Sequence, residues 1–302
     1  MPENSECTLL EVSFRGTTIN VGVYKDGASN KKDILLLHGL GSNAAEFYEK
    51  MIDNLPKDRL CAIDWLGHGQ TTKLLKSEDT YDAVYLSEYL KVVLNALIEK
   101  KILAEEFFVV AKSMSAIPLA YLYDNYKDNF KKIVLIAPAG FDEKMGYLFA
   151  FFSSFITRNI ILSWFFSWFI LDRNKRKILQ SNLKIKDWGE IVSRYSRAGY
   201  DLFGHMHSTH IVGNVFNKID KPILLICGTR DFIFPKRNYL NFAKDNKWEV
   251  LVLEGKEHSL EKKNYEKFKN SICKFIEIQD TNPRASVAIH IISTVQELDQ
   301  FV

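Results

Sequence analysis

The sequence predicts an α/β fold in which helices flank a mostly parallel sheet of eight strands. Short, fully apolar runs alternate with helical patterns along most of the chain, which is typical of parallel strands buried on both faces. Residues 8–14 and 19–24 instead alternate apolar and polar residues around Arg15-Gly16, a pattern that indicates an antiparallel hairpin at a sheet edge. A composition of 47% hydrophobic and 25% charged residues is that of an ordinary soluble globular protein.

Six apolar runs supply the remaining strands. They are 34–37 (ILLL), 60–63 (LCAI), 107–110 (FFVV), 133–136 (IVLI), 223–226 (ILLI) and 250–253 (VLVL). Between them, 85–101 repeats apolar residues at helical spacing with one buried face, and further helices are expected near 236–245 and 259–277. The strands fall into two groups, 33–138 and 222–254, so we expect one sheet interrupted by an insertion.

Charge and cysteine content exclude several classes of protein. With 40 Lys and Arg against 37 Asp and Glu, the net charge is only +3, and no duplex-binding surface or nucleic-acid partner is expected. The four cysteines are scattered and form no C-x-x-C pair, which argues against a disulfide framework and favours a reducing compartment. The first ten residues, MPENSECTLL, do not resemble a signal peptide, so a cytoplasmic location is expected.

The aromatic residues are unevenly distributed. They make up 13% of the chain, and eleven of the 39 lie between 141 and 171. Arg158 is the single charged residue from 147 to 171, a length and polarity that would suit a transmembrane helix. The residues that precede and follow this stretch, described below, argue against a transmembrane helix.

Residues able to do chemistry follow the predicted strands at their carboxyl ends, where open parallel sheets bind ligands. These segments are His38-Gly39-Leu40-Gly41, Asp64 to Thr71 (DWLGHGQT), Ala111-Lys112-Ser113-Met114-Ser115, Gly228-Thr229-Arg230-Asp231, and Glu254 to His258 (EGKEH). A serine on a strand-to-helix turn, then an acid, then a histidine is the chain order of an α/β-hydrolase triad. Over roughly 8–277 the sequence therefore resembles the α/β-hydrolase superfamily.

The resemblance implies a catalytic triad of Ser113, Asp231 and His258. His258 would take the proton of Ser113 as general base, and Asp231 would orient the imidazole and stabilise its charged form. The backbone N–H groups of Leu40 and Met114 would form the oxyanion hole. His38 and His68 are expected to be structural hydrogen-bonding residues beside this site.

The turn around Ser113 departs from the family pattern G-x-S-x-G, because Ala111 and Ser115 stand where glycines are usual. Both are small, so the tight turn stays feasible. An alternative register with Ser115 as nucleophile would place the β-branched Ile117 at the second small position, where it should clash. Ser113 is therefore the favoured nucleophile.

The resemblance also implies a domain organisation. Residues 1–140 and 213–277 would form the hydrolase core, 141–212 a helical cap over the site, and 278–302 a C-terminal extension of unknown role. A membrane crossing at 147–171 would separate Ser113 from Asp231 and His258 across the bilayer, so this stretch must pack on the protein, lie in an interface, or both.

We assign Phe149, Phe152 and Trp164 of this cap to substrate binding. The segment 172–186, with a net charge of +5, could be a solvated helix face or could contact anionic lipid headgroups. The hypothesis is a lid that makes peripheral membrane contact.

The sequence thus predicts a serine hydrolase that acts on a hydrophobic small-molecule ester, similar to capped esterases and monoacylglycerol lipases, with no cofactor. Thioesters, amides and carbon–carbon bonds β to a carbonyl remain open as substrates. The alternative is a non-catalytic protein of the same fold that binds a hydrophobic ligand or a protein partner. His205, His207 and His210 form an H-x-H-x-x-H pattern, but no carboxylate or cysteine accompanies them at ligand spacing, and no metal is expected.

Overall fold

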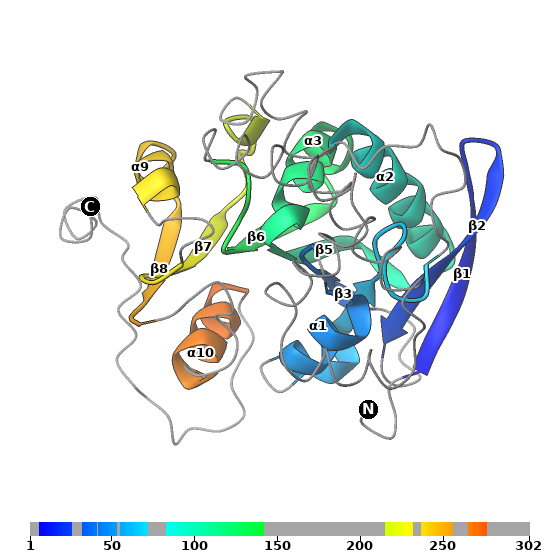
Figure 1. Ribbon diagram of the computed structural model, residues 1–302, viewed down its shortest axis with the longest axis horizontal. Coiled ribbons are helices and arrows are strands. Elements are labelled where there is room, and N and C mark those ends of the chain that lie inside the picture. The colour runs from blue at the N-terminus through cyan, green and yellow to red at the C-terminus, as the bar shows by residue number, and fades with distance from the viewer. Residues whose placement is uncertain are drawn as a thin grey trace, which may run out of the picture.

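A central sheet of eight strands organises the molecule (Figure 1). The computed structural model describes residues 6–25, 32–40, 42–52, 55–71, 83–141, 215–231, 237–255 and 265–276. In sheet order, the strands are β1 (Glu6–Phe14), β2 (Thr17–Lys25), β4 (Leu60–Ile63), β3 (Lys32–Leu37), β5 (Leu103–Lys112), β6 (Phe130–Ile136), β7 (Ile223–Gly228) and β8 (Glu249–Leu253). All eight predicted strands are confirmed.

The pairing directions also agree with the sequence. β1 and β2 form an antiparallel hairpin that places β1 at the edge, and β2 pairs antiparallel with β4. The remaining neighbours, from β4 through to β8, pair in parallel. The carboxyl ends of β3 to β8 therefore meet at one edge of the sheet, where the candidate residues follow the strands.

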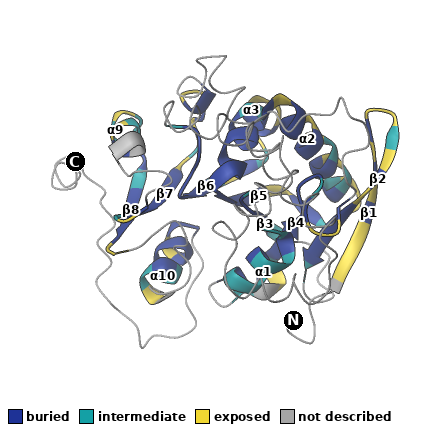
Figure 2. Ribbon diagram, in the orientation of Figure 1, coloured by how far each residue is buried: buried dark blue, intermediate teal, exposed yellow. Residues whose placement is uncertain are grey.

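Helices cover both faces of the sheet. Helices α2 (Ala83–Glu99), α3 (Ala116–Tyr126) and α9 (Arg237–Asp245) lie on one face, and α1 (Ala44–Ile52) and α10 (Tyr265–Phe275) lie on the other (Figure 1). Successive residues of a strand pack into the hydrophobic cores on opposite faces of the sheet. Leu35 packs in the core with α2, α3 and α9, and Leu36 packs in the core with α1 and α10. The parallel strands β3 to β8 are therefore largely buried on both faces (Figure 2), which explains their lack of polar alternation, whereas β1 at the sheet edge keeps an exposed face.

Predicted and observed helices agree within a few residues for α2 and α9. The helix expected at 259–277 is described only from Tyr265 to Phe275. Helix α1 was missed, although its buried residues Ala44, Phe47, Tyr48 and Met51 lie at the i, i+3, i+4 and i+7 positions of one helix face. This helical spacing of apolar residues is present in the sequence, but it extends over only nine residues.

Four aromatic rings connect the two ends of the predicted cap. The ring of Phe141, after β6, stacks on that of Phe216, before β7, with centroids 4.5 Å apart. Phe242 of α9 and Trp248, which precedes β8, lie 5.2 Å from each other, and the Phe242 ring also lies 5.2 Å from Phe141. The chain therefore leaves and re-enters the core at one aromatic cluster.

Several predictions fall on residues outside the described part of the chain. These are the cap at 141–212 beyond Phe141, with Phe149, Phe152 and Trp164, and the extension at 278–302. Their assignments stay predictions. Among the helices that the structure does describe, none combines the length and the apolar character needed to cross a membrane.

Candidate active site

Ser113 occupies a strained turn between strand β5 and helix α3. The strand ends at Lys112, a short 3₁₀ turn covers Ser113–Ser115, and α3 begins at Ala116. The φ angle of Ser113 is 53°, in the left-handed region that residues with a side chain rarely adopt. Such strain persists where the surroundings enforce it and is typical of a nucleophile elbow. The sequence prediction of a strand, a tight turn and a helix around Ser113 agrees with this geometry.

The turn requires small residues next to Ser113, and the structure provides them. Gly39 lies directly against the serine, because a Cβ atom built on Gly39 would be 3.0 Å from the Ser113 Cβ and 3.6 Å from its Oγ. Ala111 is fully buried at the position where the family pattern has glycine. On another side, the N–H of Ala139 donates to the Ser113 carbonyl at 3.0 Å. Segments after β3 and β6 thus enclose the elbow.

Asp231 lies in the loop that follows β7, and it is 5% exposed. Its N–H donates to the Gly228 carbonyl at 3.4 Å, which folds the loop back over the end of the strand. Only β6 separates β5 from β7, so the strands that lead to Ser113 and Asp231 are about 10 Å apart. An imidazole and the two side chains can span that gap.

Thr229 ties the loop of Asp231 to the loop that leads toward His258. The N–H of Thr229 donates to the Leu253 carbonyl at 3.1 Å, and the N–H of Gly255 donates to the Thr229 Oγ1 at 2.8 Å. His258 itself lies outside the described residues, three positions after Gly255. The chain that carries it therefore starts beside the Asp231 loop.

The two predicted oxyanion donors flank the serine from different loops. Met114 follows Ser113 inside the 3₁₀ turn and is buried, and Leu40 follows Gly39, the residue that touches Ser113. Helix α3 starts two residues after Met114 and points its N-terminal end toward this turn. The dipole of α3 favours negative charge at this end of the helix.

Ser115 contributes a contact that sequence reasoning missed. Its hydroxyl donates to the His38 carbonyl and accepts a hydrogen bond from the Trp65 Nε1 at 2.8 Å. Trp65 also binds the imidazole of His38, because its backbone N–H donates to Nε2 at 3.2 Å. The Nδ1 of His38 then carries the hydrogen and donates to the Gly39 carbonyl at 2.9 Å. His38 is a buried structural residue, as expected.

Asp64, after β4, is a buried carboxylate beside this network. Its Oδ1 accepts from the Ala44 N–H at 2.6 Å, and its Oδ2 accepts from the Gln70 N–H at 2.8 Å. Removal of the carboxylate from water raises the pKa of Asp64 to about 6, against the opposing effect of the two N–H groups. Cβ atoms built on Gly22 and Gly69 would lie 2.4 and 2.1 Å from Oδ2, which explains why both positions are glycine. The motif DWLGHGQT indicated that this loop lies near the site, but it did not predict that Asp64 accepts hydrogen bonds from two backbone segments.

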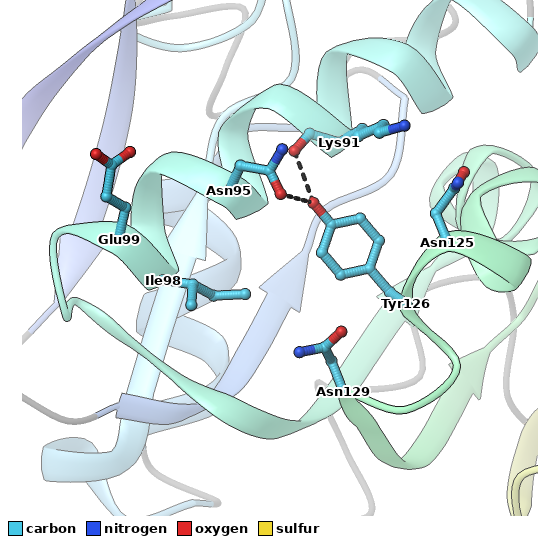
Figure 3. Close-up of a pocket in the computed structure, with 7 residues that line it drawn as sticks. All are labelled: Lys91, Asn95, Ile98, Glu99, Asn125, Tyr126 and Asn129. Carbon is cyan, nitrogen blue, oxygen red and sulfur yellow. Dashed lines mark hydrogen bonds between the residues drawn. The ribbon is translucent and has the colours of Figure 1, made fainter.

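A surface hollow elsewhere on the molecule takes no part in this site. It has a volume of about 540 Å³, and Figure 3 shows the Tyr126 hydroxyl within it, where its single hydrogen is shared between the Lys91 carbonyl, 2.9 Å away, and the Asn95 Oδ1. Its lining residues are Lys91, Asn95, Ile98, Glu99, Asn125, Tyr126 and Asn129. They lie where β5 and β6 begin, at the sheet edge opposite Ser113.

The arrangement presents a strained serine, a buried acid in the loop two strands away, and the backbone of Gly39 and Met114 next to the serine. This is a geometry suited to nucleophilic attack on a carbonyl and stabilisation of the resulting oxyanion. Within the described ranges, no group of three or more metal-ligating side chains occurs.

Comparisons with known proteins agree with this architecture. A family model described as "alpha/beta hydrolase fold" matches residues 33–261. A search of curated proteins gave no match.

Solved structures share the fold at low sequence identity. An esterase from Thermogutta terrifontis, solved with malate bound, is 13% identical with a TM-score of 0.66, covering 90% of this chain and 98% of its own. An esterase from Exiguobacterium antarcticum is 14% identical with a TM-score of 0.63, covering 89% and 100%. A membrane phospholipase A described as a bacterial virulence factor is 16% identical with a TM-score of 0.61, covering 90% and 86%.

Proposed function

The chain belongs to the α/β-hydrolase fold family, and from this premise we propose that it is a serine hydrolase that cleaves a hydrophobic carboxylic ester. The observation that carries the proposal is the backbone of Ser113, which is held at a φ of 53° between β5 and α3 with Gly39 against its side chain. A serine that served only as a helix cap would need no left-handed conformation, since N-cap residues are typically extended.

The proposed reaction proceeds through an acyl-enzyme. The Oγ of Ser113 attacks the ester carbonyl carbon while His258 removes the hydroxyl proton, and the carbonyl oxygen becomes an oxyanion. The N–H groups of Leu40 and Met114 donate to this oxyanion. Collapse of the tetrahedral species breaks the ester bond, and the alcohol leaves with the proton from His258. Water, deprotonated by His258, then releases the acid and restores the serine.

Two features support a hydrophobic ester. Two of the structures that share the fold are esterases, and a third is a phospholipase, although at these identities they show only the fold. The sequence from 147 to 171 adds an aromatic stretch with Arg158 as its single charge. Such a segment suits an acyl chain rather than a charged substrate.

A fluorophosphonate probe and a chain-length series test the activity. We expect labelling of the wild-type protein that Ser113→Ala abolishes, and turnover of p-nitrophenyl esters that the same change lowers by at least about 1,000-fold. Ser115→Ala should remain labelled, which excludes the alternative register. A folded wild-type protein that neither reacts with the probe nor hydrolyses any ester would instead favour the non-catalytic ligand-binding alternative.

We further propose that residues 141–212 bind lipid interfaces through their aromatic and basic segments. Each cation near an anionic surface adds about 1 kcal/mol of attraction, and 172–186 carries a net charge of +5. Replacing Phe149, Phe152 and Trp164 together by serine should reduce sedimentation with anionic liposomes and slow turnover of long-chain esters, while acetate esters are hydrolysed as before. Neutral liposomes are the control. Unchanged long-chain turnover and liposome binding in this variant would overturn the lid proposal.

A further inference from the structure

The hydroxyl of Ser115 bridges the nucleophile turn to a neighbouring loop. It donates to the His38 carbonyl oxygen, across 77 residues of sequence, and it accepts from the Trp65 indole N–H at 2.8 Å. Ser115, His38 and Trp65 are all fully buried. A fully buried hydroxyl with both a donor and an acceptor partner is well satisfied, so the bridge is held away from competition with water.

Trp65 completes the bridge from a third loop. Its indole N–H is shared between the Ser115 Oγ and the His38 carbonyl, which lies 3.0 Å away. Its backbone N–H holds the His38 ring at Nε2. The main chain and the side chain of His38 are therefore both fixed by hydrogen bonds to residues after β4 and β5.

This bridge bears directly on the oxyanion hole of the proposed reaction. The peptide units of His38 and Gly39 determine where the N–H of Leu40 points. Gly39 packs so closely on Ser113 that an added Cβ atom would be 3.4 Å from the Lys112 carbonyl and 3.0 Å from the Ser113 Cβ. A small movement of this loop would change the distance between the Leu40 N–H and the oxyanion formed on Ser113.

We infer that Ser115 is a positioning residue, whose hydroxyl acts with the Trp65 indole to hold the His38–Leu40 loop where the Leu40 N–H meets the oxyanion. The inference rests on the proposed function. Ser115 stands where the family pattern G-x-S-x-G has a glycine, which has no hydroxyl with which to form such a bridge.

The oxyanion forms only after attack, so its donors stabilise the transition state more than bound substrate. Loss of the bridge should therefore lower kcat and leave KM nearly unchanged. Because displacement of a catalytic group by about 1 Å can cost about 100-fold, and only one of two donors is affected, we expect Ser115→Ala and Ser115→Gly to lower kcat by about tenfold. Trp65→Phe, which removes the indole N–H, should act in the same direction.

The test measures kcat and KM on a short-chain ester for the wild type and these three variants. Ser271→Ala is the matched control, because Ser271 is also fully buried and its hydroxyl donates to the Lys267 carbonyl within α10 at 2.8 Å. This control should keep the wild-type kcat. Thermal unfolding of every variant, and the ¹⁵N–H indole resonance of Trp65, assigned with Trp65→Phe, show whether the fold and the bridge have changed.

The outcomes separate the two proposals. A tenfold fall in kcat with a constant KM, together with a shifted Trp65 indole resonance in Ser115→Ala, supports the inference. A wild-type kcat in Ser115→Ala and Ser115→Gly, beside Ser113-dependent turnover of the wild-type protein, overturns the positioning role alone. A fall in kcat that comes with a changed KM and a lower melting temperature would show that Ser115 supports the fold as a whole, and this result would also overturn the positioning role. Absence of Ser113-dependent turnover in the wild type overturns both proposals.

Discussion

At the scale of single residues, the backbone of Ser113 stores conformational energy at the proposed site. The sequence could identify this serine from its order relative to Asp231 and His258, but not the value of φ. A left-handed conformation costs a residue with a Cβ atom about 1–2 kcal/mol, and the hydrogen bond from Ala139 to its carbonyl helps to enforce it. Function and stability are therefore expected to conflict at this position.

Replacing Ser113 by glycine should reveal this conflict. Both Ser113→Gly and Ser113→Ala remove the hydroxyl, but glycine adopts a φ of 53° without a Cβ penalty. The free energy of unfolding in urea should be about 1 kcal/mol higher for Ser113→Gly than for Ser113→Ala.

Lys101 provides a matched control, because it has a φ of 58° at an exposed position after α2. Lys101→Gly should have a higher free energy of unfolding in urea than the wild type, with no loss of ester turnover. Equal stability of the two Ser113 variants would mean that the turn carries no strain.

At the scale of elements, the site depends on loops held together across neighbouring strands. The loops after β7 and β8 belong to segments more than 20 residues apart, and Thr229 joins them through hydrogen bonds to Leu253 and Gly255. This junction sets the starting point of the chain toward His258. Local sequence could not reveal it, because the pairing follows from the parallel register of β7 and β8.

Removing the Thr229 hydroxyl should weaken this junction. Thr229→Val loses the acceptor for the Gly255 N–H while keeping the shape of the side chain. We therefore expect kcat on a short ester to fall by about fivefold, because the proposed general base His258 would be held less well. Thr229→Ser keeps the hydroxyl and should retain most of the activity.

The control for a lost threonine hydroxyl is Thr8→Val, because Thr8 donates to the Val23 carbonyl in the edge hairpin at 3.4 Å, far from the site in the sheet order. Wild-type kcat in Thr229→Val would show that the described hydrogen bond does not contribute to activity.

At the scale of the whole molecule, Asp64 joins elements that lie far apart in sequence. Its carboxylate accepts from α1 at Ala44 and from Gln70, while its carbonyl accepts from the Tyr89 hydroxyl of α2 at 2.7 Å. Helices on both faces of the sheet therefore meet at one residue. Its burial makes the stability of the entire fold sensitive to pH.

The direction of this sensitivity follows from the raised pKa. Between about pH 4 and pH 6 the folded protein keeps a proton on Asp64 that the unfolded chain releases, so the contribution of Asp64 to stability is complete below pH 4 and is lost as the pH rises through 6. For a pKa raised to about 6, the change amounts to about 3 kcal/mol.

Urea unfolding at pH 4.5 to 7.5 tests this assignment. Asp64→Asn should be less stable than the wild type throughout, because its amide NH₂ faces one of the two backbone N–H groups, and the difference should grow as the pH falls. Asp124→Asn, at an exposed ion pair with Lys218, should keep the wild-type pH slope. A wild-type slope in Asp64→Asn would assign the pH dependence to other groups.

The fold was predictable because its signals are local and repeated. Apolar runs such as 34–37 and 223–226 have no polar face, and this absence of alternation is enough to indicate parallel strands covered on both sides. Helix α1, which the sequence did not reveal, is short: its nine residues offer little more than two turns of periodicity.

The sequence by itself determined the eight strands, the parallel core and the order of Ser113, Asp231 and His258, since strand burial and motif order depend on neighbours along the chain. Tertiary structure alone decided that Ser113 is strained, that Gly39 leaves no room beside it, and that Ser115 binds His38 and Trp65. Those facts depend on contacts between segments up to 77 residues apart, where distances of a few tenths of an ångström separate a hydrogen bond from a clash.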